Sequence, residues 1–149
     1  MSLSTVRAKM KTVIESVSGI GQVHDYKRYV HDWASYKELF AKNQKINTWE
    51  IQRVHTESDP FGGSGGRENR MHNFVVRGFY AVSDDLASEK TFHELADLII
   101  DAFRNKPDLD GVANILNFPI TADFTDTMFG GVLCHVAEIN ISVSERNLF

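Results

Sequence analysis

The fold is decided by two stretches, INTWEIQRVHTES (residues 46–58) and NRMHNFVVRGFYAVS (residues 69–83), joined by the glycine-rich segment DPFGGSGGRE (residues 59–68). Apolar and polar residues alternate in both stretches. In the second, one face collects His72, Phe74, Val76, Tyr80 and Val82. A period of two is typical of a β-strand with one buried side. The sequence from Ile46 to Val82 therefore predicts an oversized β-hairpin with a flexible tip.

The two arms of this hairpin change character along their length. In the first arm, Trp49 and Ile51 share a face and are expected to be buried. Arg53 and His55 continue that face, so the distal end is expected to be exposed. Gly78 interrupts the second arm and predicts a β-bulge. We expect the arms to leave the core as they approach the loop.

Three segments have the period of an amphipathic helix. Leu3–Val17 and Ser88–Asn105 each place apolar residues on one face, and the second is predicted to be the main helix of the core. Its apolar face contains Phe92, Leu95, Ala96, Ile99, Ala102 and Phe103. Asp32 is a suitable N-cap for a third, short helix over Trp33–Lys42.

Further strands are predicted at Gln22–Val30, Val112–Phe118 and Val132–Val143. Thr121–Gly131 is interpreted as a polar loop and Ser144–Phe149 as a loose tail. The order α-β-α-β-β-α-β-β predicts the α+β class. We expect one mainly antiparallel sheet, helices packed on one of its faces, and a long protruding β-hairpin.

Length and composition indicate one globular domain over residues 1–149. The hydrophobic fraction of 42% and the charged fraction of 24% are ordinary for a folded protein. The single cysteine, Cys134, excludes an internal disulfide and a thiolate-rich zinc site. No apolar run reaches the roughly 20 residues of a membrane helix, and charges interrupt the N-terminal segment. We therefore expect an intracellular protein that does not enter a membrane.

The charge balance argues against binding that depends on nucleic-acid phosphates. The formal net charge is −4, from 16 basic and 20 acidic residues. Tight phosphate binding needs clustered lysine and arginine. The basic residues Arg7, Lys9 and Lys11 are interpreted as the solvated face of the first helix.

Residue motifs for metal or nucleotide binding are not found. None of the six histidines forms a ligand pair such as HExxH. The segment FGGSGG (residues 61–66) leads into a strand through Arg67, whereas a phosphate-binding loop opens a helix. The acidic pairs Asp84–Asp85 and Asp108–Asp110 flank a helix at turns, where aspartate is favoured. The sequence predicts no catalytic residue, cofactor or metal, and hence a protein that is not an enzyme.

Aromatic residues and hairpin length point to contacts between chains. Phe124 and Phe129 lie in the predicted loop, outside the predicted core. An arm of a dozen residues spans about 40 Å, against a gyration radius of about 15 Å for such a domain. Projecting strand edges usually pair with another chain. We predict a homo-oligomer with contact residues Pro60, Phe61, Gly62, Gly63, Arg67, Phe124 and Phe129.

The order of these segments resembles a known family. After the N-terminal helix come WASYKELF (residues 33–40), the hairpin ending in RGFYAVSDD (77–85), TFHELADLIIDAFRNKP (91–107) and GVLCHVAEINISVSE (131–145). Over nearly the whole chain this layout resembles tail terminator proteins, also called tail completion or minor tail proteins, of tailed bacteriophages.

The resemblance implies an α+β subunit that closes into a ring, usually of six. Such a ring caps the finished tail tube and docks it to the head, so its partners are the tail tube and the neck or head-completion proteins. DNA passes through without specific binding. The protein would lie in the virion after assembly in the host cytoplasm, with no catalytic residues.

Two alternatives remain open. One is another connector protein of the phage neck, where similar small α+β domains occur. The other is a small-molecule-binding or catalytic α+β domain with a pocket between sheet and helices.

Overall fold

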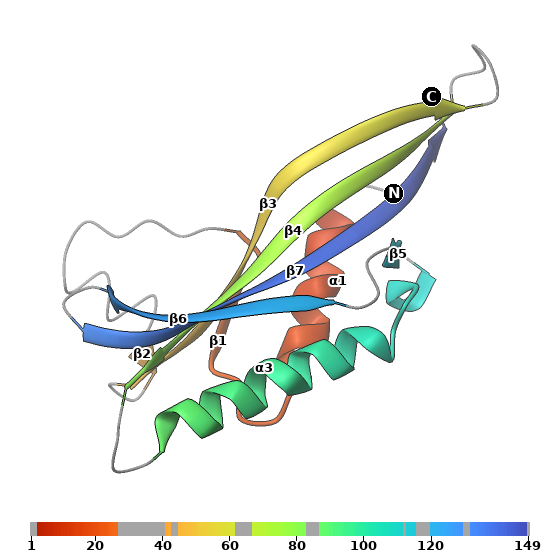
Figure 1. Cartoon of the computed structure of the whole chain (residues 1–149). Coiled ribbons are helices and arrows are strands. Elements are labelled where there is room, and N and C mark those ends of the chain that lie inside the picture. Colours follow the sequence, from red (N-terminus) through yellow and green to blue (C-terminus); the bar gives the residue numbers. More distant parts are fainter. Residues whose placement is uncertain are drawn as a thin grey trace.

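Three long strands form most of the sheet of this α+β domain, and shorter strands and two helices lie beside them (Figure 1). The computed structural model describes residues 3–26, 41–42, 45–61, 67–82, 87–111, 113–115, 120–129 and 132–148. The helical elements are α1 (Leu3–Glu15), α3 (Ser88–Arg104) and the 3-10 turn η2 (Leu109–Gly111). The strands are β1 (Gln22–His24), β2 (Ala41–Lys42), β3 (Lys45–Phe61), β4 (Arg67–Ala81), β5 (Asn114–Ile115), β6 (Thr121–Phe129) and β7 (Val132–Leu148).

The sheet is curled and mostly antiparallel. Its strand order is β1-β3-β4-β7-β5, with β2 paired to β3 and β6 paired to β7. Only the β1–β3 pair is parallel among the described strands. The long strands stay paired as far as the hairpin end, where Phe61 pairs with Arg67 and Arg67 with Leu148. The β4–β7 pair has no register shift, and the β3–β4 pair has one. β3, β4 and β7 therefore form a continuous ribbon.

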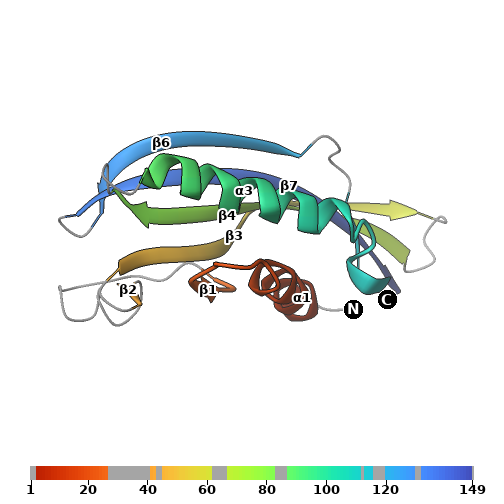
Figure 2. The same cartoon turned by 90° about the horizontal axis from the view of Figure 1, so that it is seen from below.

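The core lies between the helices and one face of this sheet. Strand residues of the main buried cluster alternate along each strand and share a face across the register, as Ile51, Val76 and Ile139 do. We call this the core face and the opposite one the outer face. α3 runs along β4 and β7, and α1 lies beside β3 (Figure 2). Helix residues of the cluster are Val6, Met10, Val13, Ile14, Phe92, Leu95, Ala96, Ile99 and Phe103.

Gly78 is not a bulge, which corrects the prediction. It pairs in regular register with Trp49. A Cβ atom at this position would overlap the indole of Trp49, whose ring stacks on Phe92 with centroids 5.4 Å apart. The glycine therefore makes room for the largest side chain of the core.

The irregularity of the hairpin lies in the other arm. The register shifts between Arg53 and His55, so Arg53 pairs with Phe74 and His55 with Asn73. The prediction that Arg53 and His55 share a face is therefore wrong, because the extra residue, Val54, reverses the alternation.

Two segments predicted to lack regular structure are strands. Residues 121–129 form β6, because Ala122, Phe124 and Met128 alternate with polar residues and the backbone pairs with β7. Residues 144–148 continue β7, since their backbone pairs with β4. Residues 144–148 were missed because their partner, β4, is distant in sequence. β6 was missed although its partner, β7, follows directly in the chain, because its threonine and aspartate residues are typical of a loop.

Other boundaries also changed. α1 and α3 end within two residues of the predictions. Of the strand predicted at 22–30, residues 22–24 form β1, residues 25–26 are not strand, and residues 27–30 lie outside the described part. Of the helix predicted at 33–42, only Ala41–Lys42 is described, and it is a strand. Of the strand predicted at 112–118, residues 113–115 are described, and only Asn114–Ile115 is a strand.

Candidate functional site

A small pocket opens between the start of α3 and the strands β6 and β7. Its volume is about 190 Å³. We call it the α3–β6 pocket; it is lined by Glu89, Phe92, His93, Phe124, Thr125, Asp126 and His135.

The β6–β7 register brings these residues together. Asp126 pairs with His135, and Phe124 pairs with Ala137. Because cross-strand partners point to the same face, Phe124, Asp126 and His135 all project from the core face toward α3. α3 itself starts at Ser88, directly after Ala87, whose backbone is left-handed with φ 51°.

A chain of hydrogen bonds links the strands to the start of the helix. His135 Nδ1 lies 2.6 Å from Asp126 Oδ1, and His135 Nε2 lies 2.8 Å from Ser88 Oγ. An ionised carboxylate only accepts, so Nδ1 donates to Asp126. In the neutral imidazole, Nε2 then accepts a hydrogen bond from the Ser88 hydroxyl.

These hydrogen bonds connect the same three residue types as a Ser-His-Asp triad. In a catalytic triad the serine is accessible and the aspartate is buried, whereas here the serine is buried and the aspartate is exposed. Ser88 is 4% exposed and does not line the pocket. The side chain of Asp126 is 60% exposed and that of His135 is 8% exposed. A nucleophile must reach its substrate. The pocket instead presents an imidazole and a carboxylate, and the serine anchors His135 to α3.

Aromatic rings form the walls of the pocket. Phe92 stacks on His135 with centroids 5.9 Å apart, and Phe124 meets Phe92 edge-on at 6.4 Å. His93 and Phe124 are closer, at 4.4 Å. Two carboxylates, Glu89 and Asp126, complete the lining. Such a mixture of ring surface and negative charge suits an organic cation.

A second polar cluster is buried on the core face farther along β4 and β7. His72 Nε2 lies 3.0 Å from Glu145 Oε1, and their side chains are 1% and 2% exposed. His72 Nδ1 lies 2.9 Å from the hydroxyl of Thr56. No described residue bonds to Glu145 Oε2. This cluster is enclosed, so we assign it a structural role.

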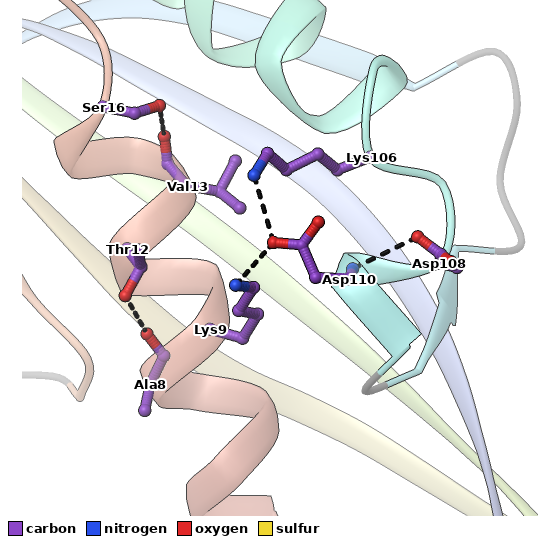
Figure 3. Close-up of polar contacts among 8 residues, drawn as sticks. All are labelled: Ala8, Lys9, Thr12, Val13, Ser16, Lys106, Asp108 and Asp110. Carbon is purple, nitrogen blue, oxygen red and sulfur yellow. Dashed lines mark hydrogen bonds and ion pairs between the residues drawn. The ribbon is translucent and has the colours of Figure 1, made fainter.

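A third cluster joins α1 to η2 at the surface (Figure 3). Asp110 Oδ2 accepts from Lys9 Nζ at 2.5 Å and from Lys106 Nζ at 3.0 Å. Hydrogen bonds from Lys9, and then from Lys106, lower the pKa of the Asp110 carboxyl below its usual value. Asp108 accepts from the Asp110 amide, as expected for this pair at a turn, whereas Asp84 and Asp85 lie outside the described part.

The predicted contact residues lie in two groups. Pro60, Phe61 and Arg67 meet at the hairpin end through the pairs Pro60↔Glu68 and Phe61↔Arg67, and their side chains lie outside the described part. Gly62 and Gly63 also lie outside it.

Phe124 and Phe129 lie elsewhere, on β6. The side chain of Phe129 is outside the described part. Phe124 is 40% exposed and lines the pocket. The contact residues therefore do not form one site.

Sequence reasoning missed the residues that surround Phe124. The alternation Ala122, Phe124, Asp126 was a usable signal for a strand with these side chains on one face. His135 likewise continues the inward series of Ala137 and Ile139. Nothing local connects Ser88 to His135.

In the part of the chain that is described, no group of three histidine, cysteine, aspartate or glutamate side chains is arranged to hold a metal ion. The described helices are too short or too polar to cross a membrane.

Comparison of the chain with models of known protein families and with curated proteins found no match.

Proposed function

We propose that this protein is a structural subunit of a phage tail: a tail-terminator-like chain that closes into a ring, ends the tail tube and docks it to the head. In this proposal the distal part of β3 and β4 protrudes and contacts the neighbouring subunit. The supporting observation is that two long strands of the described sheet, β3 and β6, have uncovered edges on opposite sides of the sheet.

The first uncovered edge belongs to β3. On the side away from β4, β3 pairs with β1 through Thr48–Glu50. From Ile51 to Phe61 no other described strand pairs on that side. Such an edge spans about 35 Å. Residues 53–59 are all exposed. Unpaired backbone groups on an exposed edge readily accept a strand of another chain.

The second uncovered edge belongs to β6. This strand pairs with β7, and no described strand pairs on its other side. β3 and β6 are thus opposite edges in the order β3-β4-β7-β6. Contact between unlike edges is heterologous, and repeated rotation about one axis closes it into a ring. The net charge of −4 is compatible with a channel through which DNA slides.

The experiment is native mass spectrometry with electron microscopy, on the protein alone and mixed with phage tail tubes. We expect a discrete ring, or a monomer that assembles only on tubes. Deletion of residues 61–66 is expected to keep the circular dichroism spectrum and weaken assembly, because a loop tip contributes little to the core. A monomer that never binds tubes would contradict the proposal. Rings that bind neck proteins but not tubes would instead indicate a neck connector.

The hydrogen-bonded chain Ser88–His135–Asp126 favours a second candidate, a catalytic or small-molecule-binding domain. A fluorophosphonate probe tests it. In a hydrolase, Ser88 Oγ would attack phosphorus, fluoride would leave, and His135 would take the hydroxyl proton. Labelling that disappears in Ser88→Ala would support this candidate. Since Ser88 is buried, we expect no labelling.

A further inference from the structure

We propose that the α3–β6 pocket binds an arginine side chain, Arg53, from the β3 edge of a neighbouring copy. The inference rests on the proposed ring, and it identifies the contact that specifies which edges meet.

The size of the pocket sets the class of its occupant. Sites for cofactors and drug-sized ligands usually have volumes of about 300–1,000 Å³. The α3–β6 pocket has about 190 Å³. It is therefore suited to one side chain and too small for a nucleotide.

The lining selects a cation. Glu89 and Asp126 are both exposed acids of the lining. Asp126 uses Oδ1 for His135, and its Oδ2 has no hydrogen-bond partner among the described residues. Glu89 occupies the first turn of α3, so its charge opposes the anion binding that a helix start would otherwise favour.

The ring surfaces select guanidinium among cations. A planar guanidinium stacks on aromatic faces while it donates two parallel hydrogen bonds to a carboxylate. The exposed ring of Phe124 stands beside Asp126 in the lining, with His93 at 4.4 Å from it. A lysine ammonium would use the charge but not the stacking surface.

The surroundings of the pocket indicate a protein as the source of the cation. Met128 is 62% exposed and Leu133 is 47% exposed. They pair across β6 and β7 on the same face as Phe124. Large exposed apolar side chains that gather beside a polar pocket are typical of protein contacts. A free amine would leave this surface uncovered.

The β3 edge carries a cationic and an apolar side chain that complement the α3–β6 pocket and the apolar surface beside it. Arg53 is exposed, and no described residue forms an ion pair or hydrogen bond with it. Arg7, Arg77 and Arg104 all have such partners, and Arg70 also interacts with other groups. Val54, beside Arg53, is 54% exposed and sits at the bulge. Bulges commonly re-aim side chains at functional edges.

These residues lie on opposite edges of the sheet, so one copy cannot make the contact with itself. Arg53 is on β3, and the pocket is lined by residues of α3, β6 and β7. β3 and β6 lie on opposite sides of the pair β4 and β7 (Figure 1). A neighbouring copy can place Arg53 between Glu89 and Asp126, and Val54 against Met128 and Leu133. Each subunit then donates one arginine and accepts one, which is the pattern of a closed ring.

Charge exchange tests the contact. Arg53→Glu and Glu89→Arg are each expected to weaken self-association roughly 30-fold or more, because each removes one side of a desolvated charge pair. The double variant is expected to recover most of the assembly. Arg104→Glu is the matched control, since Arg104 is exposed on α3 and outside the pocket. Sedimentation velocity and native mass spectrometry measure the assembly, and the melting temperature checks the fold.

A second measurement isolates the chemistry of the pocket. In the Arg53→Glu variant, N-acetyl-arginine methylamide should shift the NMR signals of Phe124 and His93, and the lysine analogue should do so less. No shift would overturn the guanidinium assignment. Rings that Arg53→Glu leaves intact would overturn this inference while the proposed function stands. A chain that stays monomeric with and without tail tubes would overturn both.

Discussion

The absence of a side chain at Gly78 determines how the largest buried residue, Trp49, packs in the core. Its place opposite Trp49 lets the indole lie flat on the strand and stack on Phe92. We expect Gly78→Ala to lower the free energy of unfolding by about 1–3 kcal/mol, because the added methyl overpacks the site. Urea denaturation measures this. Thr127→Ala, at an exposed strand position, is the control, and equal stability of both variants would contradict the packing account.

The ion pairs of Asp110 are expected to make the stability of the fold depend on pH. Lys9, and then Lys106, lower the pKa of Asp110 from the ordinary 3.8. A depressed folded pKa means that the stabilisation is fully present above the unfolded pKa and is lost as the pH falls through the folded pKa. Asparagine tolerates the positive φ of this position, 55°.

We therefore expect Asp110→Asn to be less stable than the wild type at pH 7 and equally stable well below pH 3.8. Chemical denaturation at several pH values measures the difference. Roughly 1 M salt at pH 7 should reduce the difference, because exposed pairs are screened. A difference that persists at low pH would show that the carboxylate charge is not its cause.

The buried pair of His72 and Glu145 should behave differently. Glu145→Ala leaves His72 Nε2 without its partner at a site that is 1% exposed, and is expected to cost about 3 kcal/mol. Replacing both residues with leucine should recover part of that loss. A double-mutant cycle in urea measures the coupling. Additive effects would mean that the two side chains do not interact.

At the scale of elements, two neighbouring residues of α3 with similar side chains and different exposure allow the packing of this helix to be tested. Ile99 is fully buried, and Leu98 is 46% exposed. Ile99→Asp is expected to unfold the domain, because it places an unpaired charge against the sheet. Leu98→Asp should change the melting temperature by only a few degrees. Circular dichroism follows both, and similar behaviour would mean that the core face of α3 is assigned wrongly.

Elements with strong local periodicity were predictable, and polar strands that are defined by their backbone pairing were not. The alternation in the hairpin arms and the apolar stripe of α3 gave boundaries close to those observed. β6 was missed because threonine and aspartate made it look like a loop, although its backbone pairs with β7. The end of β7 is polar and is a strand only because β4 lies beside it.

The site was less predictable for the same reason. Phe124 was predicted to contact another chain, and that stays a prediction. The structure places Phe124 in the lining of the pocket. Ser88 and His135 are 47 residues apart, so only the packing of α3 on the sheet brings them together. A local sequence pattern predicts which face of a helix or strand is buried. It does not predict which residues far apart in the sequence will be hydrogen-bonded to each other.

At the scale of the whole molecule, the two edges of the sheet differ in chemistry. The β3 edge carries Arg53 and Val54, and the β6 edge carries acids, aromatic rings and Met128. In the proposed ring these unlike edges meet, and a difference between the edges is what we expect of a heterologous contact. A two-fold dimer would instead require the same patch to complement itself.

The position of β7 has a consequence for the order in which the chain can fold. β7 pairs with β4, β5 and β6, yet it is made after all of them. Until residues 132–148 leave the ribosome, β4 and β6 have no strand between them, and α3 lacks half of the surface it covers. Synthesis at about 5–20 residues per second delays this step by several seconds. Cooperative closure of the domain therefore cannot precede the synthesis of β7, and until then β4 and β6 each lack the partner that lies between them.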